Sequence, residues 1–264
     1  MTAQDLEALR EAKHILENPG LAAKITNALG VPVERTLQLL PDGWSLAVSR
    51  AAHSAIATAL HIAAGSLKNT LGGRAGNRFH KALVVATGAG GGAFGLAALA
   101  VELPVSTTIM LRSIASIARS QGEDLSDLRV RLACLEVFAL GGRPGRNDAS
   151  EAGYYATRSA FGKVMMDAAR FIGERGLAKE GAPPVVRLIM YVAERFGIQV
   201  SEKIATQAVP VVGAAGGALI NYVFIDHFQS MAHGHFTVRR LERIYGEEAV
   251  RNAYTGLNDI PTPQ

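Results

Sequence analysis

Apolar residues recur along most of this chain every three or four positions, the spacing that gathers them on one face of an α-helix. No stretch alternates apolar and polar residues, and no Asn-Gly or Asp-Gly pair joins two β-rich runs, so no strand is predicted. Glycine and proline separate the helical stretches. The pattern therefore predicts an all-α fold. Its helices are expected at residues 4–17, 21–29, 33–40, 44–67, 77–101, 105–121, 125–140, 150–177, 185–197, 200–208, 211–233 and 236–253.

Two parts of the chain differ from the rest because they carry no charge over a long distance. Residues 82–101 hold no charged side chain over 20 positions, and residues 204–225 hold none over 22, although Pro210 interrupts the second. Each length would span a bilayer. Both are rich in Gly and Ala, with small residues four positions apart as at Gly213 and Gly217, a spacing typical of closely packed helices. They are therefore either a buried helix pair or helices that insert into a membrane.

The expected architecture is a multi-helix bundle around these two Gly/Ala-rich apolar helices, with amphipathic helices outside. No linker separates two self-sufficient cores, so the chain is interpreted as a single domain over residues 1–264. The polar tail at residues 258–264 is expected to be frayed.

A glycine pattern in the first uncharged segment resembles a nucleotide-binding loop. Residues 90–95, GGGAFG, fit G-x-G-x-x-G. That loop needs a strand before it, a helix after it and a second parallel strand. No second strand is predicted downstream, and no Gly-Lys-Ser/Thr occurs. We therefore expect no nucleotide, and the glycines are better explained by close helix packing.

Composition narrows the function classes further. The formal net charge is only +4 and no Lys/Arg stripe forms, so no nucleic acid is expected as a partner. Cys134 is the single cysteine, which excludes an internal disulfide and a multi-cysteine metal site. Asp5, Glu7 and Glu11 lie where a secretion signal would be apolar. We expect a cytoplasmic protein, associated with the inner face of the membrane if the uncharged segments meet lipid.

Glu102 is the first candidate for chemistry, because it directly follows the first uncharged segment and lies two positions before Pro104. Proline favours the first turn of a helix, where a carboxylate meets the positive end of the helix dipole. The alternative is a buried carboxylate that pairs with Arg112 or with a ligand.

A second candidate region contains Asp226, His227, His233 and His235. Aspartate and histidine can bind divalent metals. His233 and His235 are two positions apart and face different sides of a helix, whereas His227 and His235 are eight apart and share a face loosely. No H-E-x-x-H occurs. His227 and His235 are thus weak metal candidates, and no cofactor is expected.

Several motifs, in order along the chain, resemble those of the EcsC protein family. They are LGVPVE (29–34) with residues 40–41, ELPVSTTIMLRSI (102–114) with residues 117–118 and 122–125, ACLEVFALGG (133–142), VPVVG (209–213) leading to Asn221, and HFTVRRLE (235–242) with residues 245–246. The resemblance covers nearly the whole chain. It implies an all-helical bacterial protein and carries over no catalytic residue.

The ligand-binding candidates are accordingly Glu102, Arg112, Asn221, Asp226, His235 and Arg239. The first functional hypothesis is a non-enzymatic helical protein at the membrane that binds lipid or a membrane protein. The second is a hydrolase or metal-dependent enzyme that uses the region of Asp226, His227 and His235. The third is a scaffold for a transporter complex.

Overall fold

The computed structural model describes residues 1–17, 20–30, 32–38, 40, 42–65, 95–140, 153–176, 182–207 and 213–257. Within these ranges the chain forms ten α-helices and one 3-10 turn, with no strand, which confirms the predicted all-α fold. The elements are α1 (Ala3–Glu17), α2 (Leu21–Leu29), α3 (Val33–Leu37), α4 (Trp44–Gly65), α6 (Gly95–Ser120), α7 (Leu128–Glu136), η2 (Val137–Ala139), α8 (Gly153–Arg175), α9 (Pro183–Gln207), α10 (Gly213–Tyr245) and α11 (Glu247–Gly256).

Three predicted helix breaks are wrong, because α6, α9 and α10 each run through the position where a break was expected. Pro104 lies inside α6 and removes one backbone hydrogen bond there. The helix continues because Leu103 and Thr107, on either side of the proline, are completely buried by other parts of the bundle. Tertiary packing of this kind overrides local helix propensity.

Gly234 explains why the sequence suggested a break within α10. A Cβ added at this glycine would lie 2.9 Å from Cγ of Leu16 and 3.2 Å from the backbone oxygen of Ala12. The missing side chain therefore lets α1 pack directly against α10, and its role is close approach and not helix termination.

The structure describes the two uncharged segments to different extents. Most of the first, residues 82–94, lies outside the described residues. The second is divided between the end of α9 and the start of α10, so residues 204–225 do not form one continuous spanning helix. Gly217 is buried, but a Cβ placed on it would meet no atom of the described residues within 4 Å, so the described helices make no close contact with it.

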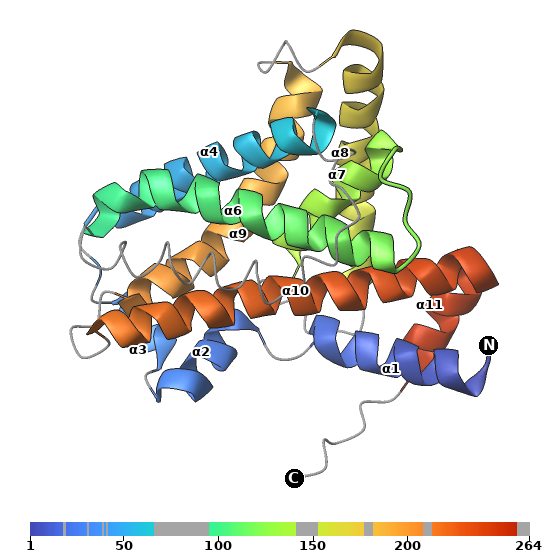
Figure 1. Cartoon of the computed structure of the whole chain (residues 1–264), viewed down its shortest axis with the longest axis horizontal. Helices are drawn as coiled ribbons and strands as arrows, with labels where there is room; N and C mark the ends of the chain where they lie inside the picture. Colours follow the sequence, from blue (N-terminus) through green and yellow to red (C-terminus); the bar gives the residue numbers. More distant parts are fainter. Residues whose placement is uncertain are drawn as a thin grey trace.

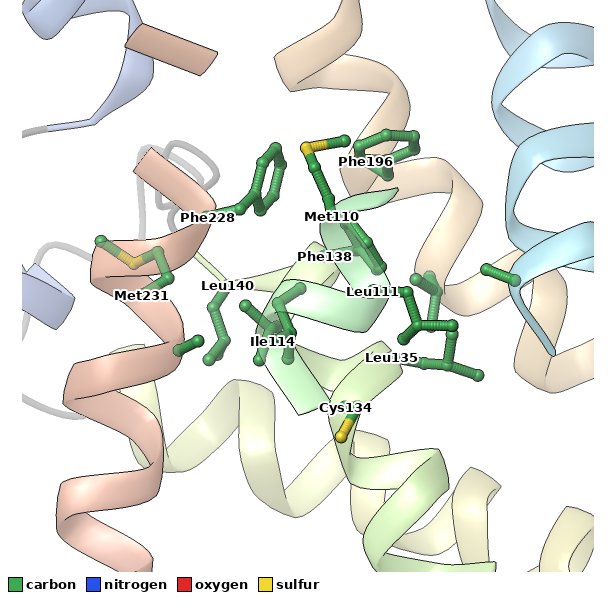
Figure 2. Close-up of a cluster of buried hydrophobic side chains, with 14 of the residues drawn as sticks. Met110, Leu111, Ile114, Cys134, Leu135, Phe138, Leu140, Phe196, Phe228 and Met231 are labelled. Carbon is green, nitrogen blue, oxygen red and sulfur yellow. The ribbon is translucent and has the colours of Figure 1, made fainter. Parts of the chain in front are cut away.

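The centre of the bundle is filled by aliphatic and aromatic side chains from α6, the α7–η2 segment, α9 and α10 (Figure 2). The rings of Phe138, Phe196 and Phe228 lie 5.2–5.7 Å apart, a spacing at which tilted aromatic pairs attract one another.

The helices α6 and α10 run side by side and parallel (Figure 1). Two side-chain hydrogen bonds set their register: Gln229 Nε2 donates to Ser113 Oγ at 2.8 Å, and Arg239 Nε donates at 2.8 Å to Oε1 of Glu123, three residues after the end of α6. Both pairs are 116 positions apart in sequence. A residue of α6 is therefore level with the residue of α10 that lies about 116 positions later.

Candidate functional site

The first of two buried polar clusters lies where α6, α9 and α10 meet, and we call it the Lys203 cluster: Glu102, Lys203, Gln207, Asn221 and Phe224. Lys203 Nζ donates to Glu102 Oε1 at 2.8 Å and lies 5.0 Å from the centre of the Phe224 ring. The Lys203 side chain is only 1% exposed and that of Glu102 13%. The two charges thus neutralise each other inside the bundle.

This arrangement corrects one interpretation of Glu102. The carboxylate lies inside the continuous helix α6 and not in a first turn, and its partner is Lys203 and not Arg112. Arg112 lies on the exposed face of the same helix.

Asn221 completes the Lys203 cluster on the side of α10. Gln207 Nε2 donates to Asn221 Oδ1 at 3.5 Å, the long end of hydrogen-bond distances. Asn221 is almost completely buried, and its Nδ2 has no hydrogen-bond partner among the described residues. The charges of the Lys203 cluster are therefore balanced within it, and the amide N–H group of Asn221 has no acceptor among the described residues.

The second cluster joins α7, α8 and α10, and we call it the His235 cluster: Glu136, Tyr154 and His235. The Tyr154 hydroxyl lies 3.0 Å from His235 Nδ1, and His235 Nε2 lies 3.6 Å from Glu136 Oε2. All three side chains are buried. The exposed fractions are 3% for Glu136, 5% for Tyr154 and 0% for His235.

Burial sets the protonation of the His235 cluster. It raises the pKa of Glu136 from 4.5 to about 8, and it lowers the pKa of His235 well below 6.5. Burial likewise raises the pKa of Tyr154. At neutral pH Glu136 is therefore mostly protonated and the imidazole of His235 is neutral, while the tautomer of the ring decides whether Tyr154 or His235 Nδ1 donates in the bond between them.

Two closed ion pairs flank the His235 cluster. Arg158 of α8 donates to both carboxylate oxygens of Glu242 at 2.6 Å. Arg239 donates to both oxygens of Glu123 at 2.8 and 3.2 Å. Although burial opposes it, Arg239 and then Arg243 hold the pKa of Glu123 below its ordinary value. The candidate Arg239 is thus engaged within the protein.

Asp226 and His227 belong to neither cluster. His227 is completely buried, neither ring nitrogen has a hydrogen-bond partner among the described residues, and burial lowers its pKa to about 3. His227 and His235 are eight positions apart on α10, about 12 Å along its axis. No group of three His, Cys, Asp or Glu that could hold a metal ion occurs in the described part of the chain. The region predicted from sequence is therefore divided between separate environments.

The sequence interpretation did not single out Glu136, Tyr154 or Lys203. A signal existed for two of them. Glu136 is the one charged residue in the apolar run ACLEVFAL, and Lys203 directly precedes the uncharged segment that starts at residue 204. A lone ionisable residue in such a setting is either buried with a partner or functional. Tyr154 carried no comparable signal.

Comparison with known proteins gives one match. Neither a curated protein nor a solved structure matches this chain. The family model of the EcsC protein family matches residues 3–241 of the 264, which agrees with the order of motifs along the sequence. The chain therefore belongs to the EcsC protein family.

Proposed function

We propose that this chain is a non-enzymatic helical protein that binds the surface of a lipid bilayer, on the inner face of the cell membrane. The observation that supports it is a set of exposed apolar side chains: Val101 and Val105 of α6, and Leu219 and Tyr222 of α10. The offset of 116 between the two helices puts all four at one level of the bundle. We call this set the apolar end, and it lies toward the left of Figure 1, where both helices begin.

Exposed apolar groups that cluster in this way are typical of contact sites for membranes or proteins. The charges at the apolar end favour a membrane. Glu102 is the one charged residue in positions 95–111 of α6, and Lys203 neutralises it internally. Residues 213–225 of α10 carry no charge. Insertion of this end into the apolar part of a bilayer would therefore bury no net charge.

The proposed contact is shallow and does not span the bilayer. Within the described chain, Ala100–Ser120 is the one helical stretch long and apolar enough to cross a membrane, but 56% of its most apolar window is buried in the protein. Only its outer face remains for lipid. Arg112 is exposed seven positions after Val105, about 10 Å along the helix. Interfacial helices immerse their apolar face by about 5–10 Å, so Arg112 would lie level with the headgroups.

Cosedimentation with protein-free vesicles of phosphatidylcholine and phosphatidylglycerol tests the proposal. The test variant is Val101→Ser/Val105→Ser. The two valines are 71% and 45% exposed, together little more than one whole side chain. Burying one valine is worth about 1.5 kcal/mol, so we expect about tenfold weaker binding.

Met166→Ser/Met190→Ser is the matched control, because these methionines are 47% and 58% exposed on α8 and early α9, away from the apolar end (Figure 1). The control should bind like the wild type. Absence of vesicle binding by the wild type would refute the function. Equal binding by both variants would refute this surface. Binding to native membranes but not to protein-free vesicles would replace lipid by a membrane protein.

A further inference from the structure

Positive charge is concentrated in one part of the chain. Residues 43–122 contain seven Lys or Arg residues but only one acidic residue, Glu102, which gives this stretch a net charge of +6. The formal net charge of the whole chain is +4, so the remaining residues together carry −2. A charge asymmetry of this kind indicates a nucleic acid or a membrane as partner. The exposed apolar side chains of the apolar end favour the membrane.

Two arginines of this stretch are exposed on its helices, Arg50 on α4 and Arg112 on α6. Neither forms an ion pair within the part of the chain that the structure describes. The helix α4 contains no acidic residue, and Lys203 neutralises Glu102, the one acid of α6. Both guanidinium groups therefore present their charge to the surroundings of the protein.

Both arginines border the apolar end. The helix α6 packs between α4 and α10, and α4 and α6 run in the same direction (Figure 1). Arg131 joins their last parts, because its Nε donates to the backbone oxygen of Ala63 at 2.7 Å and its Nη1 to the backbone just after α6 at 2.9 Å. Counted back from the ends of the two helices, Arg50 and Val105 are each 15 residues away, about 22 Å. Arg50 is therefore about level with Val105, and Arg112 lies about 10 Å further along α6.

The acidic residues at this level do not cancel the two arginines. By the offset of 116, Asp226 of α10 is about level with Arg112, but it is half-buried and already interacts within the protein. Asp42 is exposed and precedes α4, eight positions before Arg50. Two exposed positive charges thus stand against one exposed negative charge, and the described rim of the apolar end is positive.

We infer that the bilayer bound by the apolar end carries anionic phospholipids, and that Arg50 and Arg112 bind their phosphate groups. This inference rests on the proposed function and adds the class of lipid to it. A planar guanidinium can donate two parallel hydrogen bonds to one phosphate. With the valines immersed, Arg112 lies at headgroup depth, and the long side chain of Arg50 reaches the headgroups from beside the valines. Each basic residue near an anionic bilayer strengthens binding about fivefold, so the two together contribute about twenty-fivefold.

Cosedimentation with two kinds of vesicle tests the class of lipid. One kind is phosphatidylcholine alone, and the other is an equal mixture of phosphatidylcholine and phosphatidylglycerol. We expect the wild type to bind the mixed vesicles more than about tenfold more tightly, and high salt to remove most of this difference. Arg50→Gln/Arg112→Gln should bind the mixed vesicles about twenty-fivefold more weakly than the wild type, and phosphatidylcholine alone as the wild type does.

Arg170→Gln/Arg187→Gln is the matched control, because it removes the same charge from exposed positions on α8 and early α9, away from the apolar end (Figure 1). The control should bind both kinds of vesicle like the wild type. Equal binding of the wild type to both kinds would overturn the inference and leave the proposed function standing, whereas binding to neither would refute both. An equal loss of binding in the control and the test variant would overturn the assignment of Arg50 and Arg112.

Discussion

Breaking the Glu102–Lys203 pair on one side should be much more costly than removing it altogether. In Glu102→Gln, Lys203 keeps its charge at 1% exposure, with the Phe224 ring beside it and no carboxylate. Leaving one partner of a buried pair uncompensated costs about 3–5 kcal/mol. In Lys203→Met the remaining Glu102 is 13% exposed, so water can reach it and the expected loss is smaller, about 1–3 kcal/mol.

The double variant Glu102→Gln/Lys203→Met distinguishes this reasoning from a simple loss of packing. It leaves no buried charge and nearly preserves volume, so we expect a net loss below about 1 kcal/mol. Urea unfolding gives the free energy of unfolding of each variant, provided that the m-value does not change. The coupling energy of the cycle should then be about 3 kcal/mol or more in favour of the double variant.

The surface pair Arg251–Glu247 provides the control, because its atoms are 3.0 Å apart but the side chains are 48% and 65% exposed. Glu247→Gln should cause no measurable loss of stability. If Glu102→Gln behaved like Glu247→Gln, or if the two single losses simply added in the double variant, the assignment of Lys203 as a buried charge held by Glu102 would be wrong.

Two further predictions concern α10 and Cys134. Gly234→Ala should lower the free energy of unfolding by about 1–3 kcal/mol, because the new Cβ would meet Leu16 at 2.9 Å and backbone at 3.2 Å. Gly217→Ala, where no described atom lies within 4 Å of the new Cβ, should raise it by about 0.5–1 kcal/mol in the same denaturation assay, and a loss of stability there would contradict this reasoning. Burial raises the pKa of Cys134 to about 12, so a thiol reagent at pH 8 should label it only when the protein unfolds; fast labelling in native buffer would show that the α7 interior opens.

The sequence predicted the helices well and the polar clusters poorly, for a physical reason. Helical periodicity is local, so α1 and α2 match their predicted ranges almost residue by residue. The pairing of Glu102 depends on which residue of α9 lies opposite α6. The spacing of residues along one helix does not reveal how two helices cross. The sequence offered the nearby Arg112 as a partner for Glu102, but Arg112 is exposed. Lys203, 101 positions away, is buried and forms the pair.

Two glycines of α10 also show that local sequence does not reveal which helix lies opposite a residue. The sequence treated all small residues four apart as one signal of close packing. In the structure no atom of the described helices lies within 4 Å of a Cβ added at Gly217, whereas Gly234, which the sequence assigned to a helix end, makes the tight contact with α1. What decides the role of a glycine is the helix that faces it, and only the folded chain supplies that information.

The charges of the two clusters and of the ion pairs beside them balance among the described residues. Lys203 is matched by Glu102, Arg158 by Glu242, and Arg239 by Glu123, while Glu136 and His235 are neutral together at pH 7. The apolar end, by contrast, exposes Val101, Val105, Leu219 and Tyr222 at a continuing cost in hydration. Under the proposed function, the apolar core of a bilayer would cover the exposed apolar side chains of α6 and α10, and its charged headgroups would meet Arg112.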